Sequence, residues 1–335
     1  MHKSFLSILL ALCCQYGLAQ KITELTNKPG ISIRGLSVLD NDHAWASGTK
    51  GAIAQTDDGG KNWHWFQVPG YENRDFRDIE VLDSNTAVVM AIDTPAVLLR
   101  TTDKGRHWEK VMEDTRPGMF LDAMDFDGKN AIVVGDPLDG KIYLAKSKDY
   151  GKSWQPIRKA FPSQGGCFAS SGTNIVWRNG DYLTVTGGWE SFLYWHGHVL
   201  ALPLTKGKET TGANSIAVNP DPKANISAVV VGGNFNDKER SDSNCVLVQR
   251  TFFQTPNTNS LAQPAQQPKG YKSCVMYMDR QTLIATGTSG TDISVDQGSH
   301  WTHFSDQPFH VVQKAKNGNL VLLAGPNGTI AALDL

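Results

Sequence analysis

Two arginines, Arg34 and Arg77, stand at corresponding places in the chain, and each opens a short, mainly apolar run. Guanidinium groups pair with carboxylates through two parallel hydrogen bonds, so two of them together indicate a site for an anion. Asp122, Lys272 and His310 occupy similar positions farther along. We expect the five residues to form a net-positive ring that attracts an anionic ligand or an acidic peptide. An equally good interpretation is that these charges neutralise one another.

The candidate metal ligands form weaker patterns than the arginines of the predicted anion site. His196 and His198 are two residues apart, which puts both on one face of a strand. No third ligand accompanies them, and membership of an aromatic-rich strand is the favoured interpretation. Asp122, Asp125 and Asp127 lack the glycine-centred loop of a calcium site. We therefore predict no metal site and no cofactor.

The elements that position these residues come from a repeated motif, Ser/Thr-x-Asp-x-Gly-x-x-Trp, the Asp box. Aspartate closes such a turn by accepting backbone N–H bonds, glycine supplies a positive φ, and tryptophan buries its ring between neighbouring sheets. The motif residues are thus predicted to be structural rather than catalytic. The four boxes comprise Asp58, Gly60 and Trp63; Asp103, Gly105 and Trp108; Asp149, Gly151 and Trp154; and Asp296, Gly298 and Trp301.

The spacing of the boxes gives the number of repeats. Asp58 and Asp103 are 45 positions apart, Asp103 and Asp149 are 46 apart, and three steps of 49 lead to Asp296. Residues 20–335 therefore accommodate seven repeats, and two regions within them, residues 187–204 and 231–250, depart from the pattern and carry no box.

Each repeat is predicted to form four short strands, because runs of strand-forming residues alternate with Asp, Asn and Gly turns. In the second repeat the runs cover residues 76–81, 86–92, 96–100 and 108–112. The last repeat offers only three strands, so Lys21–Thr26 is expected to supply the fourth and close the ring. The sequence thus predicts an all-β, seven-bladed β-propeller, with residues 254–270 as a long surface loop.

Residues 1–19 are predicted to be a signal peptide. Lys3 is followed by an apolar run and by small residues ending at Ala19, whereas a lipoprotein site would require a small residue before Cys13. Residues 20–335 then form a single exported domain, periplasmic or secreted. No other segment is apolar enough to span a membrane.

The composition excludes one class of partner. The formal net charge is −1, which argues against a nucleic-acid binder held by overall charge. Cys167, Cys245 and Cys274 remain after processing; buried free thiols are expected, with one disulfide pair as the alternative.

The repeats resemble those of bacterial neuraminidases. Nearly the whole mature chain more closely resembles the propellers related to photosystem II stability and assembly factors. The segments that carry this resemblance are Arg34–Val38, Phe168–Thr173, Gly270–Ser273 and Ala324–Gly328. The resemblance implies a seven-bladed scaffold acting in protein assembly, with a cationic surface of which only Arg34, Arg77 and Lys272 are present here.

An enzyme is the concrete alternative, because sialidases share the repeat. Their chemistry needs three arginines on the substrate carboxylate and a tyrosine nucleophile with a glutamate partner. Arg34 and Arg77 could be two of the arginines and Tyr271 the nucleophile, but the nearest third cation is Lys272 and no glutamate is placed beside the tyrosine. We therefore predict a non-enzymatic binding or assembly propeller with a protein or peptide partner on one face, and keep a glycan-active or glycan-binding propeller as the alternative.

Overall fold

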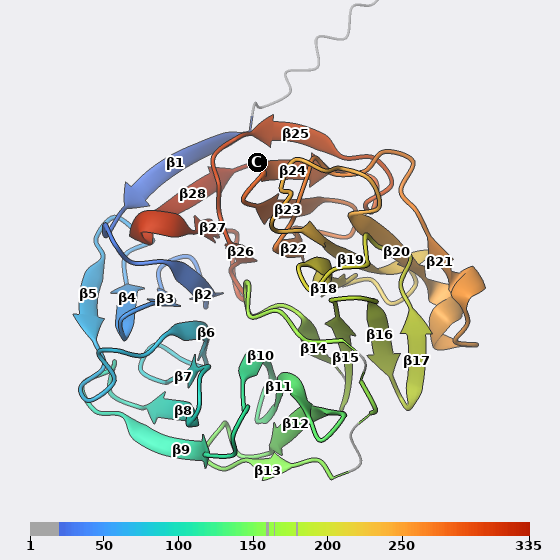
Figure 1. Cartoon of the computed structure of the whole chain (residues 1–335). Coiled ribbons are helices and arrows are strands. Elements are labelled where there is room, and N and C mark those ends of the chain that lie inside the picture. The colour runs from blue at the N-terminus through green and yellow to red at the C-terminus, as the bar shows by residue number, and fades with distance from the viewer. Residues whose placement is uncertain (1–19, 159–160, 164, 179) are drawn as a thin grey trace, which may run out of the picture.

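The computed structural model of the chain describes residues 20–335 except residues 159, 160, 164 and 179. Within these residues, seven antiparallel sheets of four strands each are arranged in a ring (Figure 1). The predicted seven-bladed β-propeller is confirmed. The predicted signal peptide, residues 1–19, lies outside the described residues.

We number the blades along the chain and give their strands from the axis outward. Blade 1 contains β2 (Ile33–Val38), β3 (Ala44–Gly48), β4 (Ala52–Thr56) and β5 (His64–Gln67). Blade 2 contains β6 (Phe76–Val81), β7 (Ala87–Ala91), β8 (Ala96–Thr101) and β9 (Glu109–Asp114). Blade 3 contains β10 (Leu121–Asp127), β11 (Asn130–Leu138), β12 (Lys141–Ser147) and β13 (Gln155–Pro156).

Blade 4 contains β14 (Ile175–Arg178), β15 (Asp181–Thr186), β16 (Phe192–Trp195) and β17 (His198–Ala201). Blade 5 contains β18 (Thr211–Val218), β19 (Ile226–Asn234), β20 (Cys245–Gln249) and β21 (Leu261–Ala262). Blade 6 contains β22 (Cys274–Tyr277), β23 (Leu283–Gly287), β24 (Gly290–Ser294) and β25 (Thr302–Ser305). Blade 7 contains β26 (Val311–Lys314), β27 (Val321–Ala324), β28 (Ile330–Asp334) and β1 (Lys21–Thr26).

In the described part of the chain, three 3₁₀ helices lie in the loops: η1 (Arg250–Phe253), η2 (Thr258–Ser260) and η3 (Pro326–Gly328). The segment predicted as a long surface loop, residues 254–270, contains η2 and the two-residue strand β21, which pairs with β20. A two-residue strand is too short to show the alternating pattern by which strands are recognised in a sequence.

The core lies between the blades. One cluster joins Trp45 and Ile53 of blade 1 to Ile79 and Val89 of blade 2, and equivalent clusters join the following neighbours. Inner strands buried on both faces read as nearly continuous apolar runs, such as β7, in which every residue is buried. Burial of apolar surface between adjacent sheets therefore holds the ring together.

Side-chain acceptors on the innermost strands also link several blades to the next one along the chain. Asp78 Oδ2 accepts a 2.7 Å hydrogen bond from the backbone N–H of Met124. Asp125 Oδ2 accepts one of 2.6 Å from the N–H of Trp177. The hydroxyl oxygen of Ser37 in blade 1 accepts a bond from the N–H of Val81 in blade 2, and that of Ser215 in blade 5 accepts one from the N–H of Val275 in blade 6. These bonds fix the angular position of neighbouring blades around the axis.

The four Asp-box turns share one geometry. In the first, the hydroxyl of Thr56 accepts a 3.0 Å bond from the N–H of Gly60, and Asp58 Oδ1 accepts a 2.9 Å bond from the N–H of Asn62. The other three boxes repeat both bonds within 0.1 Å of these lengths. All four box glycines have φ between +72° and +88°, which is the left-handed region that favours glycine. Trp108 and Trp154 donate to the carbonyls of their box glycines, whereas Nε1 of Trp63 and of Trp301 makes no such bond.

The described cysteines, Cys167, Cys245 and Cys274, are free and buried. Burial raises the pKa of all three thiols, so they behave as small apolar side chains. In the described part of the chain, no helix has the length and apolar character needed to cross a bilayer.

Candidate functional site

The segment Phe168–Thr173, which we call the plug, lies at the centre of the ring, where it contacts blades 1, 2, 5 and 6. It precedes β14 and passes close to the middle of the ring (Figure 1). Its Ser171 hydroxyl donates to the carbonyl oxygen of Ser273 in blade 6 at 2.7 Å, and its Thr173 hydroxyl lies 2.7 Å from that of Ser215 in blade 5. The first strand of blade 4, β14, therefore begins only at Ile175, after the plug.

The predicted arginine pair, Arg34 and Arg77, meets the plug from blades 1 and 2. Arg34 Nη1 donates to the carbonyl oxygen of Ser170 at 3.2 Å, and Arg77 Nη1 donates to that of Ala169 at 3.5 Å. Both side chains are half-buried. Among the described residues Arg34 takes part in no ion pair, and Arg77 has only Asp75 at 3.7 Å. Each guanidinium has five N–H donors, so donors remain for a ligand.

The electrostatics show that positive potential accumulates here. His310 is 7% exposed, and burial, together with the charges of Arg34 and Arg77, lowers its pKa to about 3. Burial lowers the pKa of Arg34, and the charge of Arg77 lowers it further. His310 is therefore neutral at physiological pH, and the two guanidiniums supply the charge of the site.

Asp122 contributes less negative charge than the sequence suggested. It is fully buried, and neither carboxylate oxygen makes a hydrogen bond of normal geometry. Burial raises its pKa well above the ordinary value, and the neighbouring Asp136 raises it further, while Arg77 and the N–H groups of Ala169 and Asp136 oppose the rise. A carboxyl group whose pKa is raised offsets less of the positive charge of the arginine pair.

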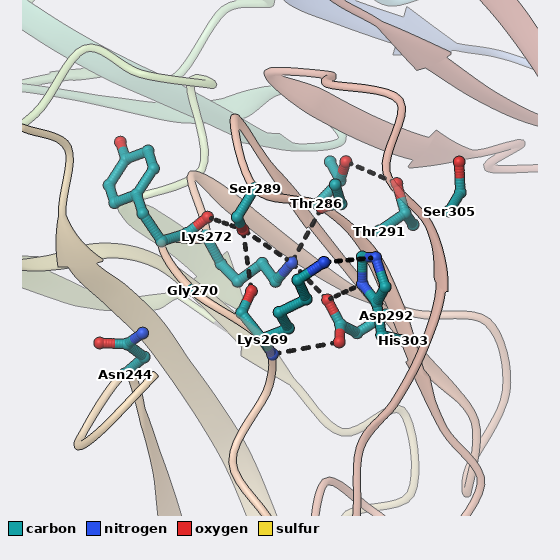
Figure 2. Close-up of polar contacts among 12 residues, drawn as sticks. Asn244, Lys269, Gly270, Lys272, Thr286, Ser289, Thr291, Asp292, His303 and Ser305 are labelled. Atoms are coloured by element: carbon teal, nitrogen blue, oxygen red, sulfur yellow. Dashed lines mark hydrogen bonds and ion pairs between the residues drawn. The ribbon is translucent and has the colours of Figure 1, made fainter. Parts of the chain in front are cut away.

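Lys272 is not an accessible cation of the predicted net-positive ring, contrary to the sequence-based expectation. Its ammonium group is fully buried and forms an ion pair with Asp292, which is 1% exposed. It also donates to Ser289 Oγ at 3.1 Å and to the carbonyl of Gly290 at 2.9 Å (Figure 2). Burial lowers its pKa, and Asp292 opposes that shift. The pair belongs to the core of blade 6.

Exposed aromatic side chains occur on the same end of the ring as the arginine pair. We call this end, where the innermost strand of each blade begins, the strand-start face. Phe235 follows β19, whose end pairs with the start of β18, and it is 43% exposed. Its ring contacts Phe168 of the plug and Tyr271 edge-on. Trp189, which follows β15, is 61% exposed. Sequence analysis missed both, because the sequence does not distinguish surface aromatics from those between blades.

The other candidate residues do not come together as a metal site. His196 Nε2 pairs with Asp181 at 2.9 Å, whereas the ring of His198 stacks on Trp195. Asp125 is committed to the N–H of Trp177. Among the described residues, no group of three or more His, Cys, Asp or Glu side chains could hold a metal ion.

The sialidase arrangement does not assemble either. Tyr271 is 4% exposed, its hydroxyl donates to Asn214 Oδ1 at 2.8 Å, and burial raises its pKa to about 12. A nucleophilic phenol requires a carboxylate as proton acceptor, and an amide cannot replace it. Lys272, the nearest third cation in sequence position, is committed to Asp292.

Comparison with known proteins identifies the family of this chain. Residues 25–312 match the family model described as photosynthesis system II assembly factor YCF48. The chain belongs to this family. A photosystem II assembly lipoprotein Ycf48 from Synechococcus is 25% identical over 190 residues, which is 56% of this chain and 53% of that protein. The chloroplastic photosystem II stability/assembly factor HCF136 of rice is 28% identical over 130 residues, covering 36% of this chain and 30% of the relative. The matches thus span about a third to a half of these relatives.

Two solved structures share the fold of this YCF48-family chain. The structure entitled "YCF48 bound to D1 peptide" superimposes with a TM-score of 0.65 at 16% identity, covering 94% of this chain and 97% of the other. YCF48 from Cyanidioschyzon merolae gives a TM-score of 0.62 at 17% identity, with 94% and 98% covered. At these identities the likeness concerns the propeller itself.

Proposed function

We propose that this chain is a non-enzymatic binding and assembly propeller that holds an acidic peptide segment of a partner protein on its strand-start face. The observation that carries the proposal is the arginine pair, whose half-buried guanidiniums lie beside a neutral His310. Among the described residues, no carboxylate is closer to either of them than Asp75, at 3.7 Å from Arg77. Partly buried guanidiniums bind carboxylates more strongly than fully solvated cations do.

Two further observations support a peptide rather than a small anion. Phe235 and Trp189 offer exposed apolar area on the same face, and aromatic and arginine side chains are enriched where proteins bind proteins. The solved relative's title names a bound D1 peptide. We also propose that the protein acts after export, with cleavage near Ala19, and that the four Asp boxes are structural; relatives carry the names lipoprotein and chloroplastic.

The test is a thermal-shift titration of residues 20–335 with 12-residue peptides of net charge −4 and +4 and with sialic acid. A ligand that binds only the folded state raises the melting temperature once its concentration exceeds its dissociation constant. The acidic peptides should raise it, and the rise should shrink at least fivefold in Arg34→Gln/Arg77→Gln. Arg280→Gln, an exposed arginine away from this site, is the matched control. A shift with sialic acid that the double variant abolishes would contradict the proposal and favour the glycan alternative.

A further inference from the structure

We call the end of the ring opposite the arginine pair, where the innermost strand of each blade ends, the strand-end face. On this face the Asp boxes cover the clefts between neighbouring blades. A Cβ on Gly105 of blade 2 would lie 2.7 Å from Phe66 of blade 1, and one on Gly298 of blade 6 would lie 3.1 Å from Leu247 of blade 5. Gly60 and Gly151 are packed against the preceding blade in the same way. Each box thus covers the cleft between its own blade and the one before it.

Blades 4 and 5 lack this cover. The turn between β16 and β17 is reduced to His196–Gly197, and η1 and η2 replace the box in blade 5. A cavity of about 960 Å³ lies at this place, and its wall includes Phe126 of blade 3, Trp195 of blade 4 and Val218 of blade 5. That volume is at the upper end of the range for ligand sites, roughly 300–1,000 Å³.

The plug makes this cavity a separate site. Gly172 and Thr173 of the plug line its inner end, and from there it extends along the axis to Met276 and Lys314. The arginine pair contacts Ser170 and Ala169 and is absent from the cavity wall. A ligand in the cavity therefore does not contact the arginine pair.

The lining combines partly exposed apolar groups with charged groups. Trp195, Phe253, Val218 and Met276 are half-buried and line the cavity. Such amphipathic aromatic and flexible sulfur-containing side chains suit an inserted apolar side chain of a peptide.

Most of the acidic groups in the wall already have partners. Glu80 pairs with Lys316 at 2.5 Å, and Asp181 pairs with His196 at 2.9 Å. Asp125 accepts the N–H of Trp177 and lies 3.7 Å from Arg178. Asp221 accepts the N–H of Lys223 at 2.9 Å and has no cation partner within the described chain.

Two cations in the wall have only carbonyl partners. Arg250 Nη1 donates to the carbonyl of Lys223 at 3.1 Å, and Lys314 Nζ donates to that of Met278 at 2.5 Å. No ion pair among the described residues includes either side chain. A carbonyl dipole does not neutralise a cation, so both attract a carboxylate; the charge of Lys314 also acts on Asp279, whose pKa it helps to lower.

We infer that the box-free cleft of blades 3 to 5 is a second binding site, which takes a peptide segment with an aromatic or aliphatic side chain next to an acidic residue. The apolar side chain lies against Trp195 and Phe253, and the carboxylate pairs with Arg250 or Lys314. The inference goes beyond the proposed function, because it concerns the opposite face of the ring and different residues.

The test is selection of a random 12-residue peptide library displayed on phage against residues 20–335, followed by fluorescence anisotropy of the enriched peptides. We expect peptides in which an aromatic or aliphatic residue adjoins Asp or Glu, and whose affinity falls at least tenfold in Arg250→Glu/Lys314→Glu. Arg250→Glu alone should weaken them severalfold, and because this side chain is exposed the single variant keeps the test valid should the double variant misfold.

The matched control is Lys148→Glu/Arg280→Glu, which makes the same charge change at exposed positions outside the cavity and should leave the affinity within twofold. The inference is overturned when no enriched peptide loses affinity in the Arg250 variants, or when the control variant weakens binding equally. It is also overturned when the selection enriches no such peptide.

Discussion

The hydroxyl of Ser171 donates a 2.7 Å hydrogen bond to the carbonyl oxygen of Ser273, 102 residues further along the chain. With the bonds from Arg34 and Arg77, it ties the plug to blades 1, 2 and 6. The plug is thus built into the fold and divides the axis into two separate ends, each with its own chemistry.

The plug should be sensitive to substitution of Gly172, which has φ +68° and where a Cβ would lie 2.4 Å from Asp78 Oδ1. We expect Gly172→Ala to lower the free energy of unfolding by more than about 2 kcal/mol, because left-handed strain adds to steric overlap in a packed centre. Urea denaturation measures it. Gly128→Ala, at φ +60° with open space around it, should cost only about 1 kcal/mol. Equal losses in the two variants would show that Gly172 is not tightly packed.

Most of the architecture could be predicted from the sequence, because the spacing of the boxes and the strand-forming runs are properties of short sequence segments. β6 has the predicted bounds, and β1 coincides with the segment expected to complete the last blade. The plug could not be predicted, because Phe168–Thr173 has the composition of a surface loop and only contacts with distant blades place it at the axis. The burial of Lys272 in an ion pair could not be predicted either, because its partner Asp292 lies on β24, in another part of blade 6.

The buried Lys272–Asp292 ion pair leads to a prediction about the free energy of unfolding. Lys272→Met should destabilise the protein by about 3–5 kcal/mol, because it leaves the Asp292 carboxylate buried without its cation. The double variant Lys272→Met/Asp292→Leu should recover much of that loss in chemical denaturation. Lys206→Met breaks the exposed pair with Glu190 and should change stability by less than about 1 kcal/mol. A double variant as unstable as the single one would contradict this account.

His310 should make stability depend on pH. Its pKa is lowered from 6.5 to about 3 by burial and then by Arg34 and Arg77, so between these values the unfolded chain binds the extra proton and stability falls as the pH falls. At about pH 4.5 the loss attributable to His310 is roughly 3 kcal/mol, at 1.36 kcal/mol for each pH unit below 6.5.

His310→Gln removes this titration. Unfolding free energies of the wild type and the variant, measured from about pH 7 to pH 4.5, should therefore differ increasingly in favour of the variant. A difference that stays constant across this range would show that His310 titrates normally in the folded protein.

The box turns should depend on their hydroxyl residues. Thr101 is 1% exposed, and its hydroxyl accepts the N–H of Gly105 at 3.0 Å and donates to Asp103 Oδ1 at 2.9 Å. We expect Thr101→Val to cost about 1–3 kcal/mol, because the valine leaves the N–H of Gly105 unpaired. Thr101→Ser keeps both bonds and should retain most of the stability in thermal and urea unfolding. A serine variant as unstable as the valine variant would assign the loss to packing of the methyl group.

Blade 7 joins the two ends of the chain, because β1 pairs antiparallel with β28, with Ile22 opposite Leu333. A chain that emerges from its N-terminus presents β1 first and must keep it unpaired until the last residues arrive. Until β28 is available, β1 is thus an open edge that invites pairing with other chains. Closure of the ring requires β28, so we expect deletion of residues 330–335 to yield a chain that accumulates in aggregates rather than a ring with a frayed tail.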